Sequence, residues 1–335
     1  MATAFITGVE GLELSAGERA FLRAADPWGF IIFKRNIDTP VQLRALIASL
    51  RETVGRNAPV LVDQEGGRVQ RLGPPYWPKY PPGSFYGAIY DRDRAAGLAA
   101  AKGGARLIAY DLFDVGIDVD CLPIADVPAN DGDPIIGDRA YGTSPAKVAQ
   151  IGAAIAEGLL AGGVLPVLKH IPGHGRATAD SHHTLPVVDS DRAELESSDF
   201  AAFRPLAKLP LGMTAHVVFS AIDPLAPATT SGTMVREVIR QHLGFDGLLM
   251  SDDISMGALS GTLSERSRAA LGAGCDVILH CNGKLDEMRE VASALPRLQG
   301  EGARRADDAL TRRRQPVPFD IEAAREELNA MMALA

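Results

Sequence analysis

The sequence predicts a single (β/α)8 barrel of the TIM type, and three observations lead to this prediction. Eight short runs rich in β-forming residues recur along the chain, helical patterns separate them, and 335 residues give room for eight such units. A doubly wound sheet would more often use about five to seven strands. We therefore expect one barrel domain over residues 1–335, with further helices at its C-terminal end.

Each expected strand is a short apolar run bounded by glycine, proline or polar residues. In chain order the runs cover residues 4–9, 29–33, 59–63, 116–120, 164–169, 211–217, 247–252 and 275–280. Two of the intervening helices begin with a hydroxyl residue followed by proline, at Thr39-Pro40 and Ser144-Pro145. Because the hydroxyl can cap a helix and proline suits its first position, we expect helices from these points to Gly55 and to Gly162.

Two segments interrupt this alternation. Residues 71–94 contain five prolines, and we expect them to form a long loop over one end of the barrel. Residues 300–316 are rich in arginine, and we expect these arginines to lie on a solvated helix face.

Composition limits the classes of partner. The 42 acidic and 34 basic residues give a net charge of -8, which argues against nucleic acid or an anionic membrane as the main partner and favours a small or neutral ligand. The three cysteines show no C-x-x-C spacing, which argues against a disulfide framework. No run of about 18 apolar residues and no secretory signal pattern occurs, so we expect a cytoplasmic protein.

Polar residues follow most of the expected strands. A barrel of this kind places its chemistry at the C-terminal ends of the strands. One aspartate there often only caps a helix, and one lysine often only reaches solvent. Several at corresponding positions predict a shared site, and here they are Asp63, Asp120, Lys169, His170, His216, Asp252, Asp253 and Asn282.

Residues 168–186 contain four of the seven histidines. A metal site fits poorly, because Pro172 and the neighbouring glycines exclude the helix that would place His170 and His174 on one face. A catalytic metal stays a minor alternative. The glycines also imitate a dinucleotide fingerprint, but Thr178 stands where glycine or alanine is needed.

Acid/base chemistry fits this segment better. Asp180 and His182 are two residues apart, and a carboxylate beside an imidazole fixes its tautomer and raises its pKa toward neutrality. An ordinary polar surface loop would explain that pair alone. A nucleophilic carboxylate such as Asp252 at a rigid strand end would complete a hydrolase that forms a covalent intermediate.

Four motifs, in order, carry a resemblance to a known family. Residues 169–182, "KHIPGHGRATADSH", resemble a signature of family 3 glycoside hydrolases of the β-N-acetylhexosaminidase type. Residues 62–71, 136–141 and 251–256 resemble three further motifs, and the resemblance extends from about residue 8 to about residue 282. The departures, such as isoleucine where phenylalanine is common in "KHIPG", affect no catalytic group.

The resemblance implies a retaining exo-β-N-acetylglucosaminidase that acts on muropeptides bearing 1,6-anhydro-N-acetylmuramic acid in cell-wall recycling. By position in the motifs, Asp252 would be the nucleophile, and His182 would be the acid/base on a mobile loop with Asp180 as its partner. The residues that would hold the sugar are Asp63, Arg71, Arg139, Lys169 and His170. We expect a monomer without metal or cofactor.

Two alternatives stay open at this point. A phosphorolytic variant is permitted, since an imidazole repels a phosphate dianion less than a carboxylate would. A non-catalytic sugar-binding relative is the alternative from another class, and the retained Asp180, His182 and Asp252 argue against it.

Overall fold

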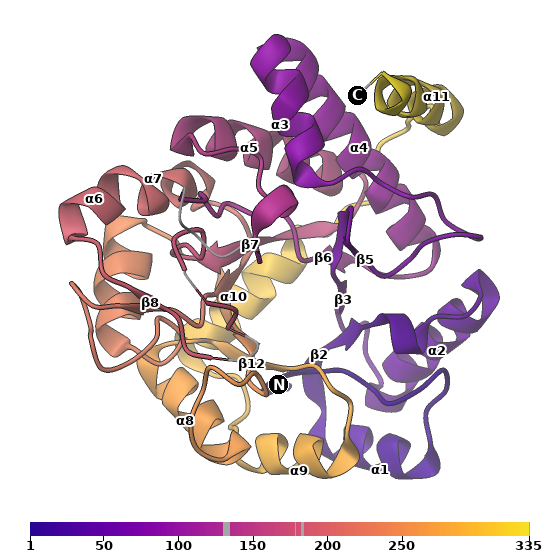
Figure 1. The fold of residues 1–335 in the computed structure, drawn as a ribbon. Coiled ribbons are helices and arrows are strands. Elements are labelled where there is room, and N and C mark those ends of the chain that lie inside the picture. Colours follow the sequence, from indigo (N-terminus) through magenta and orange to yellow (C-terminus); the bar gives the residue numbers. More distant parts are fainter. Residues whose placement is uncertain (130–134, 178, 182–183, 335) are drawn as a thin grey trace.

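The computed structural model describes residues 1–129, 135–177, 179–181 and 184–334, and its centre is a closed barrel of eight parallel strands (Figure 1). The strands neighbour one another in the order β1, β2, β3, β6, β7, β9, β11 and β12, and β12 closes against β1. Each of the eight expected runs is one of these strands, so the predicted barrel is confirmed. Their bounds are Thr3–Thr7, Pro27–Ile32, Val60–Val62, Val119–Asp120, Leu165–Ile171, Leu211–Thr214, Leu248–Asp253 and Val277–His280.

Helices surround the barrel, and within the described residues two small sheets lie outside it. The α-helices are α1 Ala16–Ala25, α2 Pro40–Val54, α3 Gly83–Arg92, α4 Arg94–Asp114, α5 Pro145–Ala161, α6 Arg192–Ser197, α7 Asp199–Phe203, α8 Leu263–Ala273, α9 Leu285–Ser293, α10 Gly300–Thr311 and α11 Ile321–Ala333. A π-helix covers Met234–His242, and short 3-10 helices cover Lys34–Asn36, Gly137–Arg139 and Arg204–Leu206. The small sheets pair β4 (Gln64–Gly66) with β5 (Val69–Gln70) and β8 (Val187–Val188) with β10 (Val218–Phe219).

The two helix starts expected from the sequence lie where predicted. At α2 the hydroxyl of Thr39 accepts a hydrogen bond from the amide of Gln42 at 3.2 Å, and Gly55 ends the helix with φ of 67°. At α5 the side chain of Ser144 makes no capping hydrogen bond. The capping role expected for Ser144 is therefore wrong, and the proline with the apolar pattern behind it accounts for this start.

The segment of residues 71–94 is not one long loop. Its last proline, Pro82, stands immediately before α3, and α4 begins at Arg94. The prolines prevent a helix only up to that point, and the chain becomes helical as soon as they end. The irregular part before α3 is anchored to α4, because the buried hydroxyl of Tyr80 donates to Asp111 at 2.6 Å.

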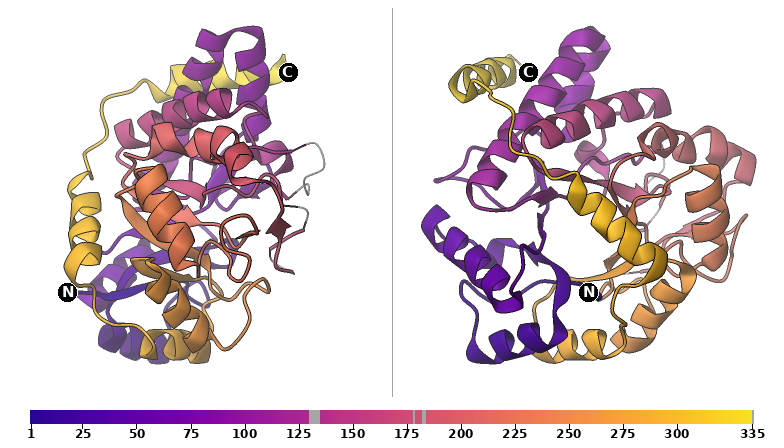
Figure 2. Two further views of the ribbon diagram at one scale, coloured as in Figure 1. Left: turned by 90° about the vertical axis from the view of Figure 1, so that its left-hand side faces the viewer. Right: turned by 180° about the vertical axis from the view of Figure 1, so that it is seen from behind.

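Helix α10 lies across the N-terminal end of the barrel, as the view from behind shows (Figure 2). Its buried Ala306 and Ala309 pack with the side chains that fill the barrel interior. Arg305 is only 15% exposed and pairs with Asp276 at 3.1 Å. The expectation of a solvated helix face is therefore wrong for this side of α10, because the helix buries apolar side chains at the N-terminal end of the barrel interior.

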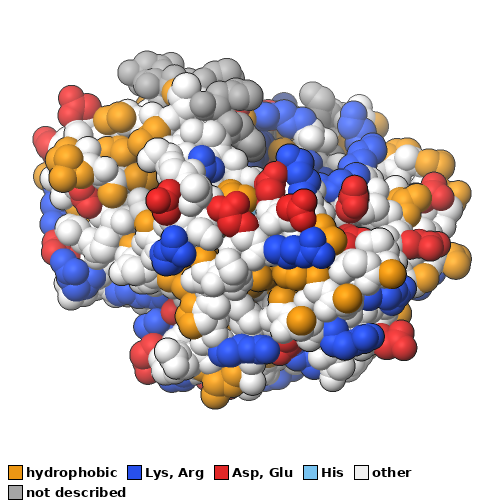
Figure 3. Space-filling view, turned by 90° about the horizontal axis from the view of Figure 1, so that it is seen from below, with side chains coloured by type: hydrophobic (Ala, Val, Ile, Leu, Met, Phe, Trp, Pro, Cys, Tyr) orange, Lys and Arg blue, Asp and Glu red, His pale blue; other side chains and the backbone are white. Residues whose placement is uncertain are grey.

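The outer helices present a mixed surface. Seen from below, the face that carries α1, α8 and α9 shows acidic and basic side chains interspersed, with hydrophobic side chains scattered among them (Figure 3). Across the described part of the chain, no helix is both long and apolar enough to cross a membrane.

Candidate active site

A pocket of about 270 Å³ opens at the C-terminal ends of the barrel strands. Seven of the side chains expected in the site line it together, although they come from distant parts of the sequence. They are Asp63, Arg71, Arg139, Lys169, His170, Asp252 and Asp253. The topology of the barrel brings them together, since every strand ends at the same rim.

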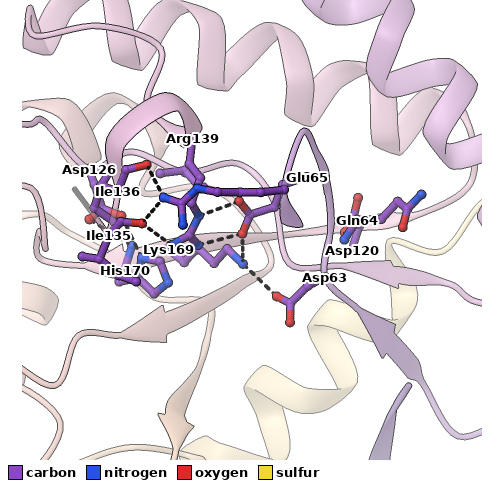
Figure 4. A network of polar contacts seen from close by, with 12 residues as sticks. Asp63, Gln64, Glu65, Asp120, Asp126, Ile135, Ile136, Arg139, Lys169 and His170 are labelled. Atoms are coloured by element: carbon purple, nitrogen blue, oxygen red, sulfur yellow. Dashed lines mark hydrogen bonds and ion pairs between the residues drawn. The ribbon is translucent and has the colours of Figure 1, made fainter. Parts of the chain in front are cut away.

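A continuous chain of ion pairs forms one wall of this pocket (Figure 4). Lys169 on β7 donates to Asp63 at 2.8 Å and to Glu65 at 2.7 Å. Arg139 contacts Glu65 through two parallel bonds of 2.8 Å, and Arg71 contacts Asp63 at 3.1 Å. Three cations and two carboxylates thus hold one another in fixed positions, and the bidentate pair also fixes the plane of the guanidinium.

Charge pairing keeps these groups ionised despite their burial. Burial alone would raise the pKa of Asp63 and of Glu65, but Lys169 with Arg71 or Arg139 lowers both values. Burial would lower the pKa of Lys169, and the two carboxylates raise it above its usual value instead. The ammonium and both carboxylates are therefore charged at neutral pH, ready to hydrogen-bond a polar ligand.

Glu65 is a member of the site that the sequence reasoning missed. Its side chain is 4% exposed and lines the pocket between Lys169 and Arg139. The signal for it was present, because Glu65 stands two residues after Asp63 and alternate residues of an extended chain share a face.

A second missed carboxylate, Asp126, fixes two histidines that line the pocket. Its carboxylate lies 2.7 Å from Nδ1 of His170 and accepts a hydrogen bond from the backbone amide of His174 at 2.7 Å. Asp126 is completely buried, and burial would raise its pKa, but His170 holds the pKa below its usual value. An ionised carboxylate at Nδ1 makes that nitrogen the donor, which leaves Nε2 of His170 available toward the pocket.

The two adjacent aspartates at the end of β11 have different surroundings. Asp253 accepts hydrogen bonds from the amide and hydroxyl of Ser255, at 3.0 and 2.8 Å, and from the amide of Cys281 at 3.2 Å. The carboxylate of Asp252 accepts from the amide of Asp253 at 2.8 Å. Asp253 therefore anchors the two loops beside it, whereas Asp252 keeps acceptor capacity at the pocket.

Asp252 is ionised at neutral pH. Burial would raise its pKa, but the imidazoles of His216 and His170 and the amide of Asp253 keep the pKa below its usual value. A charged carboxylate on a rigid strand end suits attack on an electrophilic carbon or stabilisation of a positive charge.

Comparison with known proteins decides the family. The family profile described as "Glycosyl hydrolase family 3 N terminal domain" matches residues 10–313. The chain belongs to glycosyl hydrolase family 3. A relative from Alkalilimnicola ehrlichii named "Beta-hexosaminidase" is 42% identical over 82% of this chain and 79% of its own length. Another of that name, from Tolumonas auensis, is 36% identical over 90% of this chain and 89% of its own length.

Solved structures agree with this assignment. The NagZ from Neisseria gonorrhoeae in complex with N-trifluoroacetyl-D-glucosamine superposes with a TM-score of 0.86 at 29% identity. The match covers 99% of this chain and 97% of that one. The resemblance to family 3 hydrolases of the β-N-acetylhexosaminidase type, seen first in four motifs, is thereby confirmed.

Three strand-end residues of this family 3 chain do not line the pocket as expected. Asp120 lies beneath it, fully buried, and accepts from the amide of Gln64 at 3.0 Å, and burial raises its pKa well above the usual value. His216 is enclosed between Thr229 and the carbonyl of Asp253, at 2.7 and 3.0 Å. Asn282 bonds to Glu287 instead. A strand end marks the rim of a barrel, but the local backbone decides which side chains face the pocket.

The expected acid/base pair is placed only in part. Asp180 is partly exposed, its carbonyl accepts from the amide of Thr184 at 3.0 Å, and it does not line the pocket. His182 lies outside the described residues. Among the residues that are described, no group of three or more His, Cys, Asp or Glu could hold a metal ion.

Proposed function

We propose that this family 3 enzyme is a retaining exo-acting β-N-acetylglucosaminidase, with residues 1–335 acting as one catalytic domain. Its proposed substrates are muropeptides with terminal β-linked N-acetylglucosamine on 1,6-anhydro-N-acetylmuramic acid, in peptidoglycan recycling. Relatives named "Beta-hexosaminidase" and a neighbour holding N-trifluoroacetyl-D-glucosamine support the sugar. The observation that carries the proposal is the ionised Asp252 beside a wall of paired cations and carboxylates.

In the proposed mechanism, the ion-pair wall and His170 hold the hydroxyls and the 2-acetamido group of the sugar. Charged donors and acceptors make strong hydrogen bonds, and contacts to the ring can tighten as it distorts toward an oxocarbenium ion. Asp252 forms a bond to the anomeric carbon as the glycosidic bond breaks. His182, assisted by Asp180, protonates the departing oxygen.

In the second step water releases the sugar from Asp252. His182 then takes a proton from the water as its oxygen attacks the anomeric carbon, and the bond to Asp252 breaks. Two displacements at the same carbon give net retention, and the imidazole returns to its starting protonation state.

Trapping of the intermediate tests the nucleophile and the sugar together. A fluorinated N-acetylglucosaminyl donor should add one sugar mass to the peptide that contains Asp252, and the Asp252→Asn variant should show no adduct. Product analysis by mass spectrometry with phosphate present should give free sugar. Sugar 1-phosphate would show a phosphorylase, and absence of both adduct and product would show a non-catalytic sugar-binding protein.

A pair of aryl substrates tests the choice of sugar. We expect the aryl β-N-acetylglucosaminide to be cleaved faster than the matching β-glucoside. Faster cleavage of the glucoside would defeat the assignment to N-acetylglucosamine.

Leaving-group dependence tests the acid/base. His182→Ala should slow substrates with poor leaving groups most, because a good leaving group needs little protonation. Equal losses on both kinds of substrate would contradict an acid role for His182.

The proposal also includes a monomeric chain that works in the cytoplasm. Sedimentation analysis at several concentrations tests the first, and fractionation of the producing cells tests the second. Turnover of purified muropeptide fragments, compared with that of simple N-acetylglucosamine disaccharides, tests the proposed substrate.

A further inference from the structure

A buried serine, Ser181, links the segment after β7 to two loops of the barrel. The hydroxyl of Ser181 and Nε2 of His174 lie 3.1 Å apart, and the two residues are only 3% and 4% exposed. The carbonyl of Ser181 also accepts a hydrogen bond of 3.1 Å from the amide of Ala258, in the loop after β11. Ser181 is therefore connected to the ends of two different barrel strands.

His174 is itself held firmly in place. Its backbone amide donates to Asp126 at 2.7 Å, and its ring lies edge-on to His170 at 5.9 Å. Asp126 also orients His170, so one buried carboxylate serves both histidines. Burial and the neighbouring His170 lower the pKa of His174, which favours a neutral ring whose Nε2 is hydrogen-bonded to the serine hydroxyl.

In the sequence, Ser181 stands between Asp180 and His182, the proposed acid/base pair. We infer that His174 is a positioning residue that holds Ser181, and through it the backbone that carries the acid/base pair. This inference rests on the proposed function of His182. Catalytic groups need a supporting shell of this kind, because small displacements of an acid cost much of its rate.

Two variants remove the contact from opposite sides. His174→Ala and Ser181→Ala should each lower kcat/KM by roughly tenfold to a hundredfold for aryl N-acetylglucosaminides with poor leaving groups, and much less for activated ones. The double variant should lose no more than either single variant, because both remove the same contact. His174→Gln places an amide nitrogen near the position of Nε2 and should restore part of the rate.

Ser267→Ala is the matched control. Ser267 is also fully buried, but its hydroxyl donates only to the carbonyl of Leu263 within α8. We expect this variant to leave the leaving-group dependence unchanged. Equal losses on all substrates from the His174 and Ser181 variants, without rescue by glutamine, would show a merely structural role and overturn the inference.

A second readout does not depend on activity. Because the amide of Ala258 donates to Ser181, its hydrogen exchange should become at least about fivefold faster in His174→Ala, while the amide of Leu279 in the barrel stays protected. Unchanged exchange at Ala258 would overturn the inference even in an active enzyme. If the wild-type protein cleaved no N-acetylglucosaminide, the proposed function would fail, and exchange would still report whether His174 holds Ser181.

Discussion

Glu65 provides the sharpest test of the ion-pair wall. Glu65→Gln removes the one carboxylate shared by Lys169 and Arg139, whose side chains are 2% and 11% exposed. Removal of one partner from a buried ion pair costs about 3–5 kcal/mol, because the remaining charge is left without compensation. Glutamine keeps one acceptor oxygen and Lys169 keeps Asp63, so we expect the lower end of that range, about 3 kcal/mol.

Thermal denaturation measures this loss. An unfolding entropy of about 2.1 cal/mol/K per residue gives about 0.7 kcal/mol/K for this chain, so Tm should fall by about 4 °C. The matched control is Glu157→Gln, because Glu157 pairs with Lys102 at the surface, where the two side chains are 64% and 50% exposed. An exposed pair contributes roughly 0–1 kcal/mol, so the control should shift Tm by about 1 °C or less.

The wall also predicts an effect on catalysis. With Glu65 neutral, the positions of Lys169 and Arg139 are less well fixed, and kcat/KM for an N-acetylglucosaminide should fall by about a hundredfold. The reasoning would be refuted if Glu65→Gln and Glu157→Gln lowered Tm equally. A normal kcat/KM in a destabilised Glu65→Gln would refute only the catalytic part.

Three further predictions concern neighbouring groups. Asp126→Asn should lower kcat/KM roughly tenfold to a hundredfold, because an amide no longer enforces the orientation and tautomer of His170. Steady-state kinetics measures this loss, and an unchanged kcat/KM would contradict the prediction. Asp252→Asn should abolish turnover of good and poor substrates alike while leaving Tm within a few degrees, and activity that persists on activated substrates would speak against a nucleophile. Burial lowers the pKa of His216 below its ordinary 6.5, so the unfolded chain takes up the proton first and the free energy of unfolding falls as pH drops below about 6.5. His216→Gln should flatten this decline in Tm between pH 6.5 and 5, and an unchanged slope would mean that the decline has another source.

Much of the fold could be predicted because each barrel strand carries its own hydrophobic pattern in the sequence. Every expected strand is present, since a strand buried on both faces shows as a short apolar run whatever its neighbours are. One prediction that failed, the solvated face of α10, concerns packing between distant segments. The sequence around Arg305 looks like a charged surface helix, and only the open end of the barrel, closed by Ala306 and Ala309, gives that helix a buried side.

The site likewise contains residues that local sequence patterns predict and residues that they do not predict. The strand ends and the motifs predicted that Asp63, Lys169 and Asp252 lie at the pocket, because the C-terminal ends of all strands of a parallel barrel lie at the same rim. Asp126 could not be found in this way. It follows an irregular stretch after the short strand β6, and its role depends on two histidines more than 40 residues later in the chain. Pairing partners that come from different strands leave no periodic signal in one sequence.

The ion-pair wall reconciles two demands that usually conflict. A neutral sugar is held best by charged donors and acceptors, yet burial of an unpaired charge is costly. Here each charge has a partner of opposite sign inside the protein before a ligand arrives: Lys169 lies between Asp63 and Glu65, and Arg71 and Arg139 occupy the outer ends of the chain of ion pairs. A carboxylate has about four lone-pair positions, and the bonds from Lys169 and Arg71 to Asp63 use two of them, one on each oxygen. Asp63 can therefore stay bound to its cations and still accept two sugar hydroxyls, so the wall can recognise a ligand without giving up the pairs that stabilise it.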